Sequence, residues 1–131
     1  MDYGIAIRTS ASFADAVARV REALKAQGFG VLTEIDVQPT LGDTLGVDME
    51  PDLILGACNP SLAHQALNAG RRIGLLLPCN VVIRTEANRA VIEALDPQAM
   101  VAVAGEPSLQ PVADEAATRL RTALSTLREA D

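Results

Sequence analysis

Aromatic residues are almost absent from this sequence of 131 residues: it has one tyrosine, two phenylalanines and no tryptophan. Nucleic-acid bases and sugars stack on aromatic side chains, so the composition argues against a single-stranded nucleic acid as ligand. Aliphatic residues must fill the interior instead, and the hydrophobic fraction of 49% is high enough for them to do so. A chain of this size forms one core, which predicts a single domain over residues 1–131.

Positive charge is also in deficit, with 11 basic against 17 acidic residues and a formal net charge of -6. A surface of that sign repels phosphate backbones and anionic lipid headgroups, which argues against nucleic-acid and membrane partners. The apolar runs are shorter than the roughly 18 residues that a spanning helix needs. No basic segment leads a long apolar stretch at the N-terminus, so no secretory signal is visible and we expect a cytoplasmic protein.

Metal-ligating residues are few, since the sequence has two cysteines and one histidine. That set is one ligand short of a closed tetrahedral zinc site, so a metal would need water, a carboxylate or a partner chain. Thiols stay reduced in the cytoplasm, which favours free, metal-bound or redox-active cysteines over a permanent disulfide. The sequence contains no glycine-rich phosphate loop, no serine nucleophile elbow, no CxxC and no HExxH motif.

The most informative pattern is a doubled phrase at the edge of apolar sequence, Ala-Cys-Asn-Pro at 57–60 and Leu-Pro-Cys-Asn at 77–80. If the two strands that carry these phrases are adjacent, the helical connection between them is long enough for a parallel crossover. Cys58 and Cys79 would then lie at a similar level in the sheet. This adjacency is a hypothesis, because the sequence does not prove it.

Cys58 directly precedes a predicted helix start. Asn59 is a favoured N-cap, and Pro60 suits the first helical position. The positive end of a helix dipole favours a thiolate and lowers the pKa of a cysteine. His64 lies one turn beyond Pro60, so Cys58 and His64 could form a nucleophile with its base, or half a metal site. The opposing interpretation is a cysteine that only packs and a histidine that is exposed or packed.

Hydrophobic periodicity predicts an alternation of strands and helices. The predicted strands cover residues 3–8, 29–38, 52–57, 73–83 and 90–95. The predicted helices start at Ser12 and end before Gly28, form one turn at 40–46, start again at Pro60 and Pro97, and end the domain at 109–127. Pro78 interrupts the strand at 73–83 and marks an edge or a bulge.

Two surface assignments follow from the same periodicity. In the second strand, Val31, Thr33 and Ile35 share one face, and Glu34 and Asp36 share the wet face. Two neighbouring carboxylates could serve as an acid-base or metal site, although an exposed strand face usually carries charge for solubility alone. In the last helix, the charges of Arg119, Arg121 and Arg128 are expected on the solvated side.

The sequence contains five distinctive phrases, at residues 28–37, 45–48, 54–60, 62–64 and 75–82. In this order, the phrases resemble the domain-of-unknown-function family 302. The resemblance covers nearly the whole chain from the first strand to the turn at 96–97. It implies an α+β fold: a small single domain with a curved, mostly antiparallel β-sheet and helices packed on one face, commonly seen as a dimer. It implies no established activity. The family pattern includes Cys58, Asn59, Pro60, His64, Pro78, Cys79 and Asn80.

Three function classes remain open. The favoured one is a noncatalytic homodimeric module that binds a small ligand or a protein. The second is a thiol-based redox or transition-metal module, for copper(I) or zinc, in which Cys58, Cys79 and His64 hold the metal. The third is an unrecognised enzyme, for which no complete catalytic constellation is visible. For ligand binding or redox chemistry, the candidate residues are Cys58, Asn59, His64, Cys79 and Asn80. Hydrophobic surface at a proline-interrupted edge independently favours self-association.

Overall fold

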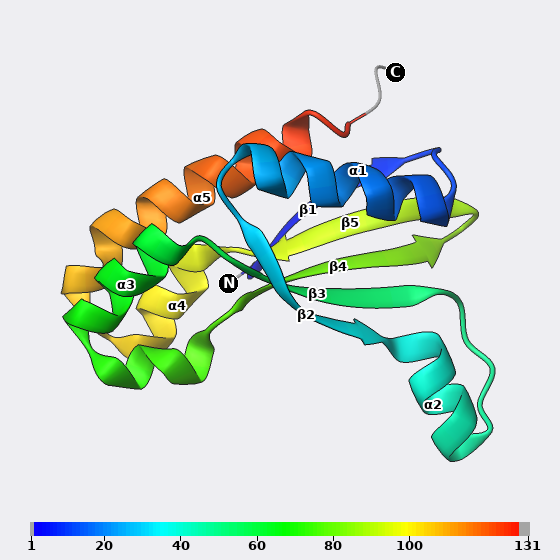
Figure 1. Cartoon of the computed structure of the whole chain (residues 1–131), viewed down its shortest axis with the longest axis horizontal. Helices are drawn as coiled ribbons and strands as arrows, with labels where there is room; N and C mark the ends of the chain where they lie inside the picture. Colours follow the sequence, from blue (N-terminus) through cyan, green and yellow to red (C-terminus); the bar gives the residue numbers. More distant parts are fainter. Residues whose placement is uncertain (1, 129–131) are drawn as a thin grey trace.

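The sheet consists of five strands in the order β1-β5-β4-β3-β2, and every neighbouring pair is antiparallel (Figure 1). This computed structural model describes residues 2–128. The strands are β1 (Gly4–Thr9), β2 (Gly30–Asp36), β3 (Asp52–Cys58), β4 (Cys79–Glu86) and β5 (Arg89–Leu95). The predicted α+β fold with an antiparallel sheet is confirmed. The parallel crossover is wrong, because β3 and β4 are adjacent but run in opposite directions.

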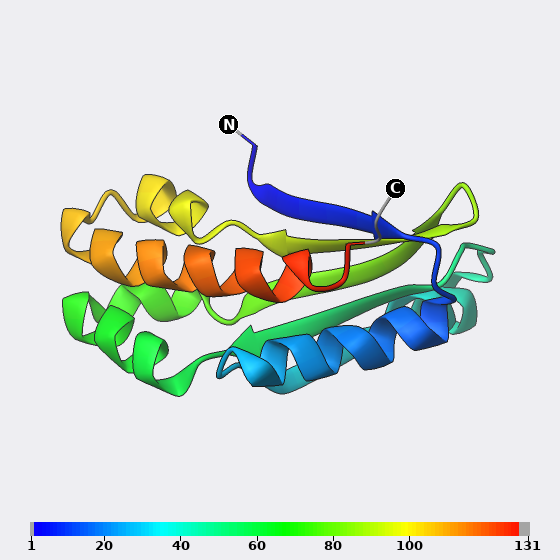
Figure 2. The same ribbon diagram turned by 90° about the horizontal axis from the view of Figure 1, so that it is seen from above.

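The helices fall into three groups around the sheet. They are α1 (Phe13–Ala26), α2 (Val37–Leu45), α3 (Pro60–Ala69), α4 (Pro97–Ala104) and α5 (Gln110–Ser125), with short 3-10 helices η1 (Arg71–Leu76) and η2 (Pro107–Leu109). Figures 1 and 2 show α1 and α5 over one face of the sheet, α3 and α4 beyond one of its ends, and α2 beyond the other. Because α5 contacts α1, α3 and α4, it connects the helix that covers the sheet face with the helices beyond the end of the sheet. Within the described residues, no helix combines the length and hydrophobicity needed to cross a bilayer.

The core is aliphatic, as the composition predicts. One face of the sheet packs on buried side chains of α1 and α5, among them Val20, Leu24, Leu120 and Leu124. Complete burial of such a side chain stabilises a fold by about 1.5–3 kcal/mol relative to leaving it in water. The predicted cap at Ser12 is confirmed, since its Oγ accepts a hydrogen bond from the backbone N–H of Asp15 at 3.1 Å.

The apolar run at 73–83 is not one strand. Residues 71–76 form η1, and β4 begins at Cys79, directly after a cis peptide bond between Leu77 and Pro78. Pro78 has no N–H to donate to the sheet ladder, so pairing starts one residue later. Ile73 is buried with Ala66 and Met100 in a second, smaller core at the end of the sheet. The run is therefore apolar because two different elements bury it.

A bulge at Leu32 reverses the predicted faces of β2. Val31 lies opposite Ala57, but the next pair joins Thr33 to Gly56, so the register shifts by one residue. Thr33 and Ile35 consequently lie on the face that the helices leave uncovered, and Ile35 is 50% exposed. The prediction that these residues share a face with Val31 is wrong.

The same register shift determines which side chain Glu34 contacts. Glu34 lies toward the helices, where its Oε2 is 2.8 Å from Nη2 of Arg21 in α1. Both side chains remain substantially exposed, so the pair contributes at most about 1 kcal/mol. Glu34 therefore serves as a surface ion-pair partner of α1.

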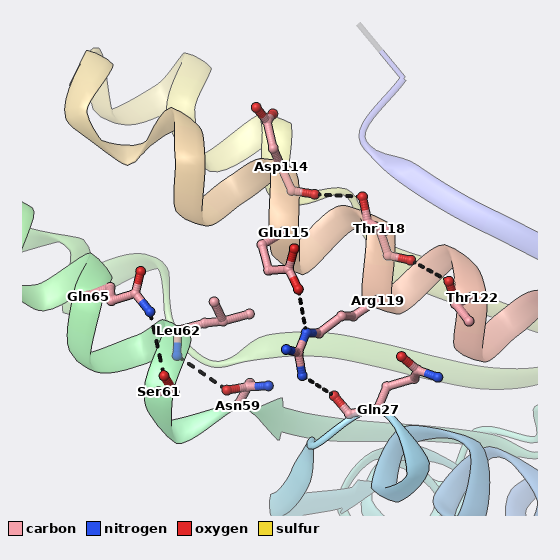
Figure 3. Close-up of polar contacts among 10 residues, drawn as sticks. All are labelled: Gln27, Asn59, Ser61, Leu62, Gln65, Asp114, Glu115, Thr118, Arg119 and Thr122. Atoms are coloured by element: carbon pink, nitrogen blue, oxygen red, sulfur yellow. Dashed lines mark hydrogen bonds and ion pairs between the residues drawn. The ribbon is translucent and has the colours of Figure 1, made fainter.

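Three helices meet where α1 ends (Figure 3). Arg119 of α5 donates from Nη1 to the carbonyl oxygen of Gln27 at 3.1 Å and from Nε to Glu115 at 2.8 Å. Arg119 was expected on the solvated side of α5, but its guanidinium instead closes the C-terminal end of α1. Gly28 follows with φ +83°, and a Cβ built there would lie 3.0 Å from Asn59 Nδ2 and 3.2 Å from Arg119 Nη1. Only glycine meets both requirements without strain.

Replacing Gly28 with alanine should therefore destabilise the fold. The left-handed backbone costs a side-chain-bearing residue about 1–2 kcal/mol, and the new methyl group crowds Asn59 and Arg119. Urea unfolding of Gly28→Ala should show this loss. Gly70→Ala is the matched control, because Gly70 has an extended backbone and no atom within 4 Å of the added Cβ. Equal stability of the two variants would contradict the prediction.

Candidate functional site

The register of β3 against β4 brings the two cysteine phrases to one end of the sheet. Ala57 lies opposite Cys79, and Gly56 lies opposite Asn80. Since the strands are antiparallel, the last residues of β3 and the first residues of β4 lie at the same end of the sheet. Cys58 and Cys79 therefore lie at a similar level, although the connection differs from the predicted one.

An apolar pocket lies at this end of the sheet, closed by residues of α3, α4 and α5. Its wall is mostly aliphatic, with Phe29 and Pro97 among the larger groups, and it includes Cys58, Cys79 and Met100. The cavity volume is about 50 Å³. Pockets for drug-sized ligands are usually about 300–1,000 Å³. As it stands, this pocket accommodates a single ion or a very small molecule.

The two thiols differ in their surroundings. Cys58 is half-buried, whereas Cys79 is 7% exposed and its Sγ lies 4.0 Å from Sδ of Met100. Burial, and to a lesser extent the charge of Cys58, raises the pKa of Cys79 to about 11. At neutral pH the Cys79 thiol is therefore protonated and a poor nucleophile. The activated thiol that a redox centre needs is not found at Cys79.

Asn59 builds the entrance to α3. Its side chain is buried, and its Oδ1 accepts a hydrogen bond from the backbone N–H of Leu62 at 3.2 Å (Figure 3). Pro60 is the first residue of the helix, so the predicted cap and start are both confirmed. The amide oxygen of Asn59 is thus engaged in holding the helix.

His64 and Asn80 lie apart from the pocket. His64 is exposed, and its Nε2 is 3.4 Å from Nδ2 of Asn68 on the same helix. Asn80 is exposed opposite Gly56, because successive residues of a strand point to opposite faces. Across residues 2–128, no three His, Cys, Asp or Glu side chains gather in a group that could hold a metal ion. The structure therefore brings Cys58, Asn59 and Cys79 together and separates His64 from them.

Met100 is the residue of this site that sequence reasoning missed. It is 8% exposed and lies one turn into α4, which begins at the predicted cap and proline, Asp96 and Pro97. Methionine is common as a filler of irregular core space, so its presence carries little functional signal in a sequence. Only the proximity of its Sδ to Cys79 distinguishes it.

A second, more open cavity lies between η1 and the end of α4, with a volume of about 390 Å³. Arg71, Arg72 and Glu106 contribute charged groups to it. Leu75 and Val103 also line it and are 79% and 71% exposed. It contains none of the candidate residues of the sequence analysis.

The sheet face opposite α1 and α5 has a mixed surface. Arg84 pairs with Glu93 at 3.1 Å and with Glu86 at 3.7 Å, and Arg8 pairs with Glu86 at 3.4 Å. All four belong to β1, β4 and β5. Both signs of charge are thus present on one patch.

Apolar residues adjoin these charges on the same face. The register aligns Ile35, Ile54 and Val82 across β2, β3 and β4, and each is at least partly exposed. Asp52 lies one row further, opposite Arg84. Its Oδ1 is buried with no hydrogen-bond partner among residues 2–128, and this desolvation raises its pKa against the opposing effect of Arg84.

Comparisons with known proteins agree with this architecture. A family model described as "Domain of unknown function DUF302" matches residues 5–127. The crystal structure of an uncharacterized conserved protein DUF302 from Bacillus stearothermophilus is similar, with a TM-score of 0.92 and 30% sequence identity. The match covers 98% of this chain and 100% of that chain. No curated protein shows a significant match to the sequence.

The burial difference between the thiols predicts their order of alkylation. At pH 8, iodoacetamide should modify Cys58 first, because a thiol with a pKa of about 11 is thiolate in about one molecule per thousand. The rate at Cys79 should rise as pH increases toward 11 and on unfolding in urea. Peptide mass spectrometry after timed quenching measures both rates. Equal rates at the two sites in folded protein would contradict the assignment.

Proposed function

This chain belongs to the DUF302 family, and we propose that it is a noncatalytic binding module that acts as a homodimer and holds a very small ligand in the apolar pocket. The observation that carries the proposal is the pocket itself, with its aliphatic wall and two cysteines, one at the end of β3 and one at the start of β4. The Asn59 amide oxygen is already occupied by the cap of α3. The groups that face the cavity therefore suit binding better than acid-base chemistry.

Xenon tests whether the pocket admits a ligand, because apolar cavities of suitable size bind this atom. In protein labelled with ¹³C at the methionine methyl groups, the Met100 signal should shift under xenon pressure, since Met100 lines the cavity. Met49 lies outside the pocket wall and serves as an internal reference. An unchanged Met100 signal would show that the pocket is closed to ligands.

A matched pair of variants locates the effect. Ala63→Leu places three extra carbon atoms at the pocket wall and should abolish the Met100 shift. Ala18→Leu makes the same change on the exposed side of α1 and should leave the shift intact. A shift that survives Ala63→Leu would place the xenon elsewhere and would count against the proposed ligand site.

The uncovered sheet face supports the homodimer. A twofold interface places one patch against itself, so a self-complementary patch needs both signs of charge, and Arg8, Arg84, Glu86 and Glu93 provide them. The partly exposed row of Ile35, Ile54 and Val82 supplies apolar area beside them.

Helix α2 adds to the same argument. It has no buried residue, and Figure 1 shows it projecting from the body of the domain. Its last residue, Leu45, is 67% exposed, and Val47 just beyond it is 44% exposed. A second copy packed on the uncovered face would give this helix a surface to contact. An isolated helix of nine residues has little stability in water without such contacts.

Light scattering coupled to size exclusion should return twice the chain mass at micromolar concentration. Ile35→Glu should shift the protein to monomer, because the new carboxylate would be desolvated beside Ile54 in the interface. Leu75→Glu is the control: Leu75 is even more exposed but lies on η1, away from this face. A monomeric wild-type protein, or equal effects of both substitutions, would refute the proposed interface.

A second candidate function is a thiol-based redox or transition-metal module. The observation that favours it is the presence of both cysteines in one pocket wall. His64, the third predicted metal ligand, lies outside that wall. For Cys58, Cys79 and His64 to bind one metal ion together, His64 would need a different position from the one it has in this structure.

A further inference from the structure

Three residues that carry sulfur line one small cavity. Cys58 comes from the end of β3, Cys79 from the start of β4 and Met100 from the first turns of α4. Cys79 and Met100 are both more than nine-tenths buried, and their sulfur atoms are 4.0 Å apart. The rest of the wall is mostly aliphatic.

The observed sulfur separation fits a shared ion. Metal–sulfur bonds are about 2.3 Å long, so two sulfur ligands that subtend about 120° at one ion lie about 4 Å apart. Cys79 and Met100 have this separation without any rearrangement. The cavity of about 50 Å³ admits one ion stripped of its water, but not a hydrated ion.

The donor chemistry selects the metal. Thiolate and thioether sulfur are soft ligands that favour copper(I), whereas magnesium, calcium and manganese prefer oxygen. Zinc also binds thiolates but takes four ligands in structural sites, and this wall offers three. A monovalent soft ion that accepts two or three sulfur ligands matches the set best.

The surrounding helices offset the resulting charge. A copper(I) ion with two thiolates and one thioether carries a net charge of minus one. Both α3 and α4 begin at the pocket. Asn59, the N-cap of α3, and Pro97, the first residue of α4, are part of its wall. The positive ends of two helix dipoles therefore lie at the wall of the same pocket, which favours an anionic complex there.

We propose that Cys58, Cys79 and Met100 form a binding site for a single copper(I) ion, a proposal that rests on the ligand-binding role of the pocket. When the ion binds, two copper–thiolate bonds form and the two thiol protons leave to the solvent. The thioether of Met100 adds a third, neutral bond. Copper enters and remains in the monovalent state, so the step involves no oxidation or reduction.

Anaerobic titration of the reduced protein with copper(I), in competition with bathocuproine disulfonate, tests the site. We expect one ion per chain, and the copper X-ray absorption fine structure should show three sulfur neighbours at about 2.3 Å. This measurement uses the unaltered protein, so it does not depend on a variant that folds. Nitrogen or oxygen neighbours in place of sulfur would overturn the proposal, as would failure to compete for copper.

Substitutions test each ligand in turn. Loss of an outer-shell partner alone weakens metal binding about 10- to 100-fold, so Cys58→Ser and Cys79→Ser should each cost at least about 100-fold. Met100→Leu keeps the side-chain volume and should cost about tenfold while reducing the shell to two sulfur atoms. Unchanged affinity and an unchanged shell in Met100→Leu would remove Met100 from the site and refute the three-sulfur set.

Two control variants separate this set from the alternatives. Met49→Leu changes a methionine outside the pocket, and His64→Ala removes the histidine on the exposed side of α3. Both should bind copper like the unaltered protein. A strong loss in His64→Ala would replace Met100 by His64 as third ligand. A mass decrease of two hydrogens with no bound copper would instead indicate a Cys58–Cys79 disulfide and refute the metal site.

The xenon measurement distinguishes the failure of this inference from failure of the proposed function. If the Met100 methyl signal responds to xenon but copper does not bind, the pocket is a ligand site for a different occupant and only the copper site is refuted. If neither xenon nor copper binds, both proposals are refuted. Copper binding with the expected sulfur shell supports both.

Discussion

The antiparallel register that sets Ala57 opposite Cys79 determines most of this structure. It fixes the end of β3 beside the beginning of β4, so the segment between them must leave and re-enter the sheet at the same end of the strands. Helices α3 and η1 form this excursion, and their apolar side chains meet α4 and η2 beyond the sheet. A small second core thus forms at that end of the sheet, and the pocket lies where this second core adjoins the main core. With a parallel pairing, the connection would have to return along the sheet, and this second core would not form at one end of it.

The near absence of aromatic residues explains how tightly this arrangement packs. Aliphatic residues and alanines at helix positions such as Ala16, Ala66 and Ala123 let the helices approach the sheet closely. On the uncovered face, neighbouring side chains rather than helices leave one backbone position with no space for a side chain. A Cβ on Gly56 would collide with Thr33 and with Pro78, whose Cγ would be 2.9 Å away. The bulge in β2 and the proline before β4 are therefore accommodated by one glycine between them.

Local signals in the sequence predicted the starts of α1, α3 and α4, because helix caps depend on a few neighbouring residues. Asn59, the predicted cap, and Asp96, which precedes the predicted helix start at Pro97, each accept a hydrogen bond from the first turn of the helix that follows. Ala87 and Asn88 have positive φ at the turn between β4 and β5, the backbone that a tight hairpin turn requires. The family resemblance supplied the antiparallel sheet, which periodicity alone could not distinguish from the parallel crossover.

What failed depended on contacts between distant residues. The bulge at Leu32 reflects pairing with β3 rather than any local preference, so alternation assigned Ile35 to the wrong face. The apolar run before Pro78 looked like a strand because a buried 3-10 helix has the same composition. Met100 is separated from Cys79 by the whole β4–β5 hairpin, and only their packing makes them neighbours.

Strand β4 shows why the site and the proposed interface can coexist. Its alternate residues serve opposite faces, with Cys79 toward the pocket and Val82 on the uncovered face, so either surface can change while the other keeps its side chains.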